Sequence, residues 1–230
     1  MLAKIALAFE HGGFFMYPIM MLQVVSLAIV IERVYFLWFK RKANNSDFVS
    51  NIEDTIRKGD LDQVMAKSSQ VKENALASAV YAGAQAAKNL GGKEEIQGRM
   101  DEVLIAENAA LDKRTSFLSM LGNVATLTGL LGTITGMIKS FAAVAYANPS
   151  EKAALLSAGI SEAMNATAYG LIVAIPALVA YAVLVNRTNN LMEELTQGAL
   201  KAFNLLSYSY DPMTVKGLKY TQKNSNETNA

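Results

Sequence analysis

The stretch from Thr115 to Ile138 constrains the fold more than any other part of the sequence, because its 24 consecutive residues carry no charge. In an α-helix, about 20 such residues rising 1.5 Å each cross the hydrocarbon layer of a membrane, which is roughly 30 Å thick. A helix that crosses a membrane satisfies all its backbone hydrogen bonds internally. The stretch therefore predicts a membrane-spanning helix.

This helix contains more glycines and hydroxyl groups than contact with lipid alone requires. Gly132 and Gly136 have the GxxxG spacing that lets two membrane helices approach closely. Thr126, Thr133 and Ser140 recur every seven residues and so share one face. We expect the helix to pack against others. Its threonines either bond the carbonyl four residues earlier, as packing residues do, or line a polar path.

Two more segments predict spans, and basic residues orient them. The first span ends in an aromatic belt followed by Lys40-Arg41-Lys42, and the third runs uncharged from Ala163 to Asn186, with Arg187 directly after it. Because positive residues stay in the cytoplasm, the N-terminus is expected outside and the C-terminus inside. The predicted organisation is an external amphipathic segment (1–13), spans (14–39, 115–147 and 159–186), an external turn (148–158), helical cytoplasmic regions (40–114 and 187–210) and a disordered tail (211–230).

Residues 40–114 hold 12 basic and 12 acidic side chains, so this region is expected in water. Phe48, Ile52 and Ile56 have the spacing of a buried helix face. Gly59 is predicted to end that helix, and Asp60 to cap the next. No helix breaker occurs between residue 93 and the second span, so a single helix of about 55 residues, roughly 80 Å long, is expected.

The composition excludes several classes of function. The chain has no cysteine and a single histidine, His11, so no disulfide, thiolate metal site or histidine-based catalytic site is expected. A net charge of +1 gives no sign of a nucleic-acid partner. We expect a protein that is not an enzyme and binds no cofactor.

Polar residues at the start of the third span are the most informative candidates for function. Glu162 lies at the predicted membrane boundary, with Asn165 one turn further along on the same face. Ionisable groups at this depth usually face a bundle interior or a watery cavity, but Glu162 at the interface can also simply be hydrated. Lys139, in the outer half of the second span, is expected to extend toward the outer surface rather than line a pore.

Two segments carry a family resemblance: GLLGTITGMIKSF (129–141) and GISEAMNATAYGLIVAIPA (159–177). Together they resemble the paired second and third spans of the ExbB/TolQ proton-channel family, which is related to the flagellar stator subunit MotA. Ile31-Glu32-Arg33 at the end of the first span fits as well, and the likeness covers residues from about 12 to 205. The three-span layout fits ExbB and TolQ better than MotA, whereas Lys139 stands where a neutral residue is more usual.

The resemblance implies an all-α integral membrane protein that forms a ring, a pentamer in this family, in the bacterial inner membrane. By position, it implies that Thr133, Thr167 and Glu162 belong to the ion pathway, with Thr126, Asn165, Gly132, Gly136 and Lys139 as further pore or packing residues. It also implies an ExbD/TolR-like partner with a single span that carries an aspartate in the membrane. If the second span is centred near Ile134 and the third near Gly170, both threonines lie near the membrane midplane.

Two alternatives remain open at this point. The chain could be a scaffold that holds a partner in the bilayer without conducting ions. The transported ion could also be sodium rather than a proton, because hydroxyl and carboxylate groups serve both.

Overall fold

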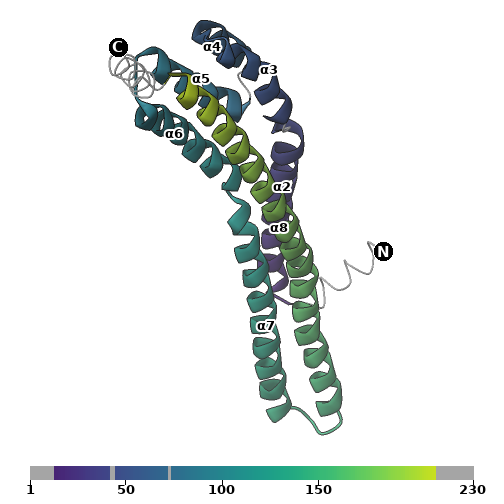
Figure 1. Ribbon diagram of the computed structural model, residues 1–230. Coiled ribbons are helices and arrows are strands. Elements are labelled where there is room, and N and C mark those ends of the chain that lie inside the picture. Colours follow the sequence, from purple (N-terminus) through teal and green to yellow (C-terminus); the bar gives the residue numbers. More distant parts are fainter. Residues whose placement is uncertain (1–12, 42–44, 72–73, 211–230) are drawn as a thin grey trace, which may run out of the picture. The chain divides into compact units, whose positions relative to one another are not determined.

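The computed structural model describes residues 13–41, 45–71 and 74–210, and all secondary structure within them is helical (Figure 1). Three helical stretches are long and apolar enough to span a membrane: Met16–Phe39, Lys93–Ala145 and Lys152–Ser207. The prediction of an all-α protein with three spans is confirmed. The amphipathic segment up to residue 12, with His11, and the tail from residue 211 lie outside the described residues.

The chain divides into two compact units, and each is described by itself. The first, called here the membrane unit, comprises the described residues 13–36 together with 113–186. The second, the bundle unit, comprises the described residues of 37–112 together with 187–210. Helix α8 (Lys152–Tyr210) is continuous and contributes to both units.

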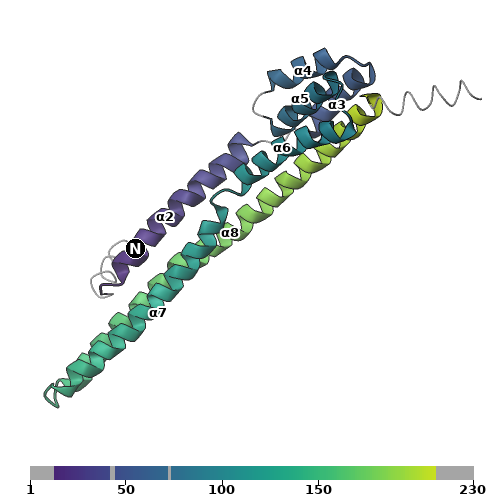
Figure 2. The same cartoon turned by 90° about the vertical axis from the view of Figure 1, so that its left-hand side faces the viewer.

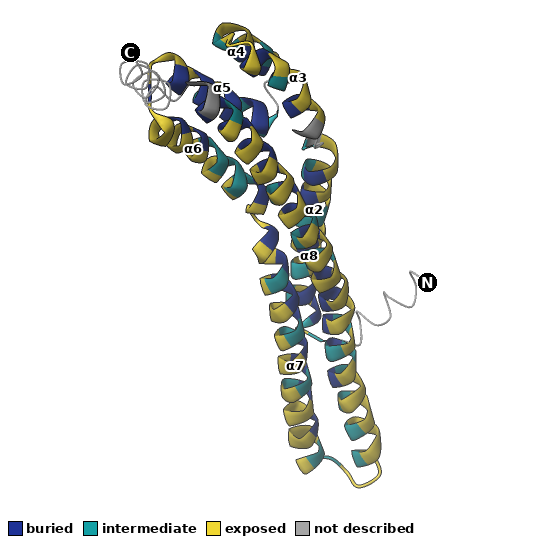
Figure 3. Cartoon of the chain, in the orientation of Figure 1, coloured by how far each residue is buried: buried dark blue, intermediate teal, exposed yellow. Residues whose placement is uncertain are grey.

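The membrane unit consists of α2 (Met16–Tyr35), α7 (Thr115–Ala145) and the first part of α8. Helices α7 and α8 form an antiparallel hairpin, closed by the turn at 146–151, and α2 lies along it (Figures 1 and 2). A small core of Ile19, Ala125, Val173 and Ala174 joins the three helices. Many large apolar side chains of these helices are exposed, as expected for surfaces that face lipid or another subunit (Figure 3).

The bundle unit begins at Leu37, within a short π-helix (Phe36–Lys40). Its α-helices are α3 (Asn45–Arg57), α4 (Leu61–Gln70), α5 (Ala75–Lys88) and α6 (Lys93–Asp112). Residues of these helices share a hydrophobic core with the last part of α8. The predicted face of α3 is confirmed, since Phe48, Ile52 and Ile56 are buried. Gly59 has the positive φ of 79° that ends α3. Asp60 caps α4 by accepting a hydrogen bond from the Gln63 backbone N–H at 3.0 Å.

The prediction of one uninterrupted helix from residue 93 through the second span is wrong. Helix α6 ends at Asp112, and α7 begins at Thr115 after Arg114, whose φ is 65°. This left-handed conformation costs a residue with a Cβ about 1–2 kcal/mol. The Arg114 guanidinium donates to the Glu32 carboxylate of α2 at 2.5 Å, and this tertiary contact accompanies the break.

Candidate functional site

The α7–α8 hairpin is held together by small residues that bring the two backbones almost into contact. A Cβ atom added to Gly129 would lie 3.1 Å from the Ala166 carbonyl oxygen, and one added to Gly170 would lie 2.8 Å from the Ala125 carbonyl oxygen. At Gly136 an added Cβ would be 2.9 Å from the Cβ of Ala163. The glycines are therefore required by close approach, and the hydroxyl groups beside them meet across the seam.

Thr133 and Thr167 meet at the centre of this close contact. Their hydroxyl groups are hydrogen-bonded to each other. The Thr167 hydroxyl also lies 2.9 Å from the Gly129 carbonyl oxygen, and the Thr133 hydroxyl lies 3.2 Å from the same oxygen. The Ala163 carbonyl oxygen is 3.4 Å from the Thr133 hydroxyl. The structure thus brings together two residues that are 34 positions apart in the sequence.

The hydrogen bonds of the two threonine hydroxyl groups determine whether the pair can donate to, or accept from, a further group. Each hydroxyl group has one proton to donate and two lone pairs that accept. Both protons have acceptors within the cluster, on the Gly129 or Ala163 carbonyl oxygen or on the other hydroxyl. The pair, which is half-buried, therefore offers mainly lone pairs to any further group. Lone pairs can accept a hydrogen bond from a protonated carboxyl group or a water molecule, or coordinate a cation.

The other predicted residues have varied environments. Glu162 is half-buried, and its carboxylate lies against Gly13, before the start of α2. Asn165 is also half-buried, whereas Lys139 is exposed. Gly132 packs against Ala166 of α8, where an added Cβ would come within 2.7 Å of the alanine Cβ.

Several other hydroxyl groups on α7 are bonded within their own helix. Thr126 donates to the Gly122 carbonyl oxygen at 3.1 Å, and Thr128 donates to that of Val124 at 2.7 Å. Ser140 is buried and donates to the Gly136 carbonyl oxygen at 2.8 Å. Thr133 makes the same kind of bond but has a second hydroxyl group beside it, which distinguishes it from the others.

The structure also fixes the level of the threonine pair along α2. A Cβ added to Gly132 would lie 3.2 Å from the Cβ of Phe15, just before α2 begins. Thr133 is about 28 Å from Arg114 along α7, which is close to the thickness of a hydrocarbon layer. Along α2, the threonine pair thus lies at the level of the end at which that helix begins.

One contact and one pocket in the membrane unit were not predicted from the sequence. The Tyr169 hydroxyl of α8 donates to the Gln23 side-chain oxygen of α2 at 2.5 Å. A pocket of about 160 Å³ lies beside this pair, lined by Gln23, Ser26 and Pro176 among other residues. A glutamine in a largely apolar span signals a polar partner, but it does not indicate which helix supplies it.

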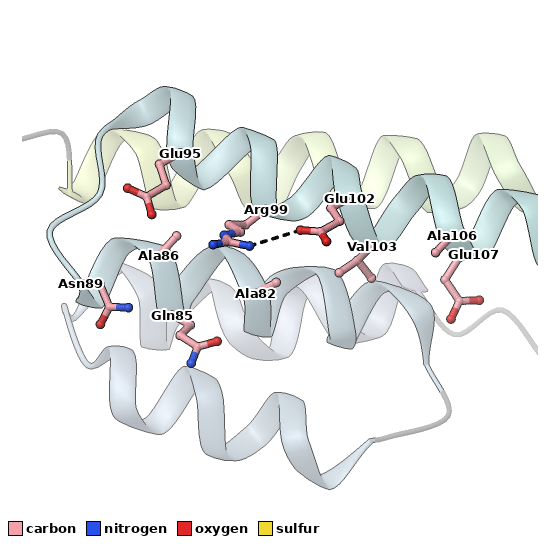
Figure 4. A pocket seen from close by; sticks show the side chains of 10 residues that line it. All are labelled: Ala82, Gln85, Ala86, Asn89, Glu95, Arg99, Glu102, Val103, Ala106 and Glu107. Atoms are coloured by element: carbon pink, nitrogen blue, oxygen red, sulfur yellow. Dashed lines mark hydrogen bonds and ion pairs between the residues drawn. The ribbon is translucent and has the colours of Figure 1, made fainter.

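The bundle unit has its own groove, of about 620 Å³, between α5 and α6 (Figure 4). Arg99 and Glu102, which line it, form an ion pair at 3.3 Å, and Glu107 pairs with Arg41 at 2.6 Å. Within the described part of the chain, no three His, Cys, Asp or Glu side chains are placed to hold a metal ion. The groove therefore offers paired charges and amide groups rather than a site for a specific ligand.

Comparison with known proteins agrees with the predicted resemblance. The sequence profile of the MotA/TolQ/ExbB proton channel family matches residues 71–197. The chain is 28% identical over 189 residues to the putative biopolymer transport protein ExbB-like 1 of Synechocystis sp., covering 80% of this chain and 72% of that one. It is 31% identical over 121 residues to the biopolymer transport protein ExbB of Pseudomonas putida, covering 53% of this chain and 36% of that one.

The similarity extends to TolQ proteins and to a solved structure. The Tol-Pal system protein TolQ of Haemophilus influenzae is 35% identical over 102 residues, which are 43% of this chain and 44% of that protein. The chain therefore spans less than half the length of some of the curated relatives it matches. Its fold resembles that of a chain in the structure of C. jejuni MotAB, with a TM-score of 0.60 and 15% identity over 93% of this chain and 85% of that one. The structure has three helical stretches that are apolar enough to span a membrane, and the hydroxyl groups of Thr133 and Thr167 meet between two of them. Because the family profile matches more than half of its length, this chain belongs to the MotA/TolQ/ExbB proton channel family.

Proposed function

We propose that this chain is the ring-forming subunit of an ion channel in the bacterial inner membrane that converts the ion gradient into mechanical work. In this proposal several copies, five by analogy with the family, surround a single-span partner of the ExbD/TolR kind. A carboxyl group in the partner's membrane helix carries the ion, and its change of charge shifts the partner within the ring. The N-terminus lies outside and the C-terminus in the cytoplasm.

The observation that supports this proposal most directly is the hydroxyl pair of Thr133 and Thr167. A carboxyl group within a membrane is costly unless polar groups surround it. The neutral, protonated form of such a group can donate a hydrogen bond to the lone pairs that the threonines offer. The charged form requires water or a cation instead. The pair thus favours one protonation state without adding a charge of its own.

Glu162 supplies the second element of the proposal. On α8 it is five residues from Thr167, about one and a half helical turns. A carboxylate at the outer entrance raises the local concentration of cations. Ions are thereby supplied to the partner's carboxyl group on the outer side of the ring. At 100 mV, the entry of each proton releases about 2.3 kcal/mol, and this is the energy available for work.

The proposal is tested by measuring ion flux through the purified complex in lipid vesicles. The full chain is purified from its own cells together with any protein that remains bound, reconstituted into vesicles containing a pH-sensitive dye, and exposed to a proton gradient. We expect proton entry that is abolished when Thr133→Val and Thr167→Val are combined. An assembled complex with no flux of protons or sodium ions in any condition would overturn the channel proposal.

One observation favours the second candidate function, a scaffold that does not conduct. Both threonine protons are bonded within the hairpin, so packing alone already accounts for their positions. The vesicle experiment separates the two functions, because a scaffold assembles with its partner but conducts nothing. Repeating it with a sodium gradient distinguishes a sodium-driven channel from a proton-driven one.

A further inference from the structure

The turn that precedes α2 makes an unusually close contact with Glu162 of α8. Gly13 has a positive φ of 68°. A Cβ atom added to Gly13 would lie 2.2 Å from Oε1 of Glu162 and 3.1 Å from its carboxyl carbon. No side chain fits at Gly13 unless the carboxylate moves. Glycine is therefore favoured here by the backbone conformation, and any side chain at this position would push the flexible end of Glu162 aside.

The charge of Glu162 also matches this end of α2. Backbone N–H groups in the first turn of a helix lack partners within the helix and carry a partial positive charge. Helix α2 has no side-chain cap and no acidic residue in its first turn. The carboxylate of Glu162 lies against Gly13 and so places a negative charge near this end of α2, where the Met16 and Tyr17 N–H groups already donate to the Gly13 and Phe14 carbonyl oxygens.

The same turn is also anchored to the threonine pair. Phe15 lies against Gly132, the residue before Thr133, and Met16 is buried. Ala163, the residue after Glu162, provides a carbonyl oxygen 3.4 Å from the Thr133 hydroxyl. Gly13, Glu162 and Thr133 are thus linked by direct contacts and by neighbouring residues on rigid helices.

From this geometry we infer that Gly13 is a positioning residue of the ion pathway: its lack of a side chain holds the Glu162 carboxylate at the entrance, above the threonine pair. This inference rests on the proposed function, because it assigns to Gly13 the placement of the glutamate that attracts ions. Any side chain at position 13 displaces the carboxylate while leaving its charge and the threonines in place. Gly13 therefore acts only through Glu162.

A double-mutant cycle tests this dependence. Proton flux is measured in vesicles for the wild-type complex, Gly13→Ala, Glu162→Ala and the double variant. We expect Gly13→Ala to lower flux about tenfold, the lower end of the range for loss of charge focusing. It should have no further effect once Glu162→Ala has removed the group it displaces. An equal fold-loss in both backgrounds would overturn the inference.

Two further variants separate displacement from other causes. Gly13→Asn also adds a Cβ, but asparagine tolerates a positive φ better than alanine does. Displacement predicts that Asn lowers flux at least as much as Ala, whereas backbone strain predicts a milder loss that would contradict the inference. As a matched control, Gly122→Ala disturbs the packing against Leu178, away from the turn that carries Gly13, and should change flux by the same factor with or without Glu162.

A cross-linking experiment tests the contact independently of conduction, and it is clean because the chain has no cysteine. A Cβ at position 13 would lie 3.4 Å from Cγ of Glu162, so Gly13→Cys combined with Glu162→Cys is expected to form a disulfide within one chain. Gly13→Cys with Lys139→Cys, whose side chain is exposed, is the control. If wild-type vesicles fail to conduct but the disulfide forms, the proposed function fails and the contact stands. If the disulfide does not form, the inference is wrong.

Discussion

At the scale of single residues, the hydroxyl groups of Thr133 and Thr167 serve both packing and the proposed function. Their protons stabilise the hairpin by bonding the Gly129 and Ala163 carbonyl oxygens. Their lone pairs remain for a partner. A membrane hydrogen bond between helices averages only about 0.6 kcal/mol, so these bonds contribute little to assembly. Loss of a bond to the transported ion or its carrier costs more, because it leaves a buried polar group unsatisfied.

We predict that Thr133→Val and Thr167→Val each leave the oligomer intact but strongly reduce flux. Valine replaces the hydroxyl group by a methyl group of similar volume, so the seam between the helices is kept. An unsatisfied buried polar group costs about 1–3 kcal/mol, and each 1.4 kcal/mol lowers a rate about tenfold. Native gels measure assembly, and vesicle flux measures the function.

Thr128→Val is the matched control for this prediction. Thr128 is on α7 and donates only to the Val124 carbonyl oxygen, about 140° around the helix from Thr133. It should lose little flux. Similar mild effects at all three positions would mean that the threonines serve packing alone.

We also predict that Glu162→Gln assembles normally and conducts more slowly. Glutamine keeps the shape of the side chain over Gly13 and removes its charge, so cations are no longer concentrated at the entrance. The loss should become smaller at high salt, because mobile ions screen the carboxylate of the wild type as well. Flux measured at low and high ionic strength checks this. An unchanged rate at low salt would make Glu162 a hydrated interfacial residue without a role in flux.

At this scale the sequence predicted the identity of the candidate residues better than their surroundings. The motifs around Thr133 and Thr167 pointed to one site, and the structure places the two hydroxyl groups in contact. The contact of Gly13 with Glu162 was not predictable from spacing. Helical periodicity indicates which residues share a face of one helix, but not which residue of another helix faces them.

At the scale of helices, the α7–α8 hairpin depends on glycine at the points of closest approach. Gly170→Val should destabilise the hairpin, because the added side chain meets the Ala125 carbonyl oxygen, and a backbone atom cannot move aside cheaply. Overpacking of this kind typically costs about 1–3 kcal/mol. We expect a lower thermal unfolding midpoint in detergent and less intact oligomer.

Gly98→Ala provides a control of the opposite sign. A Cβ at Gly98 of α6 would meet no atom within 4 Å, so no clash arises. Alanine favours a helix interior over glycine by about 1 kcal/mol. The unfolding midpoint of the bundle unit should therefore stay the same or rise. Equal destabilisation by both substitutions would show that close approach is not the reason for Gly170.

The break between α6 and α7 shows where helix prediction failed. Residues 93–145 contain no proline, and Gly98 lies well before the break, so local propensity favours continuity. Arg114 nevertheless adopts a left-handed conformation and pairs with Glu32 of α2. A tertiary contact of this kind leaves no local signal in the sequence. The buried face of α3 was easier to predict, because it depends on spacing within one helix.

At the scale of the whole molecule, the distribution of charge explains why the architecture was predictable. Three uncharged stretches and one region with 12 basic and 12 acidic residues separate membrane from water before any fold is known. The ring and the partner were not predictable in this way, since their evidence comes from the family resemblance. The exposed apolar surfaces of α2, α7 and α8 can face either lipid or a neighbouring subunit, and composition does not distinguish them.

The last prediction concerns the orientation of the chain in the membrane, and introduced single cysteines test it because the wild type has none. Asn148→Cys lies in the turn at the end of the α7–α8 hairpin, while Ser50→Cys on α3 and Gln197→Cys on α8 are exposed positions in the bundle unit. The basic residues after the first span predict that only the turn faces outward. In intact cells, a membrane-impermeant thiol reagent should therefore label Asn148→Cys alone. All three should react after the cells are opened, which controls for accessibility. Labelling of Ser50→Cys in intact cells would reverse the orientation, place Glu162 on the cytoplasmic side and contradict the proposed path of ion entry.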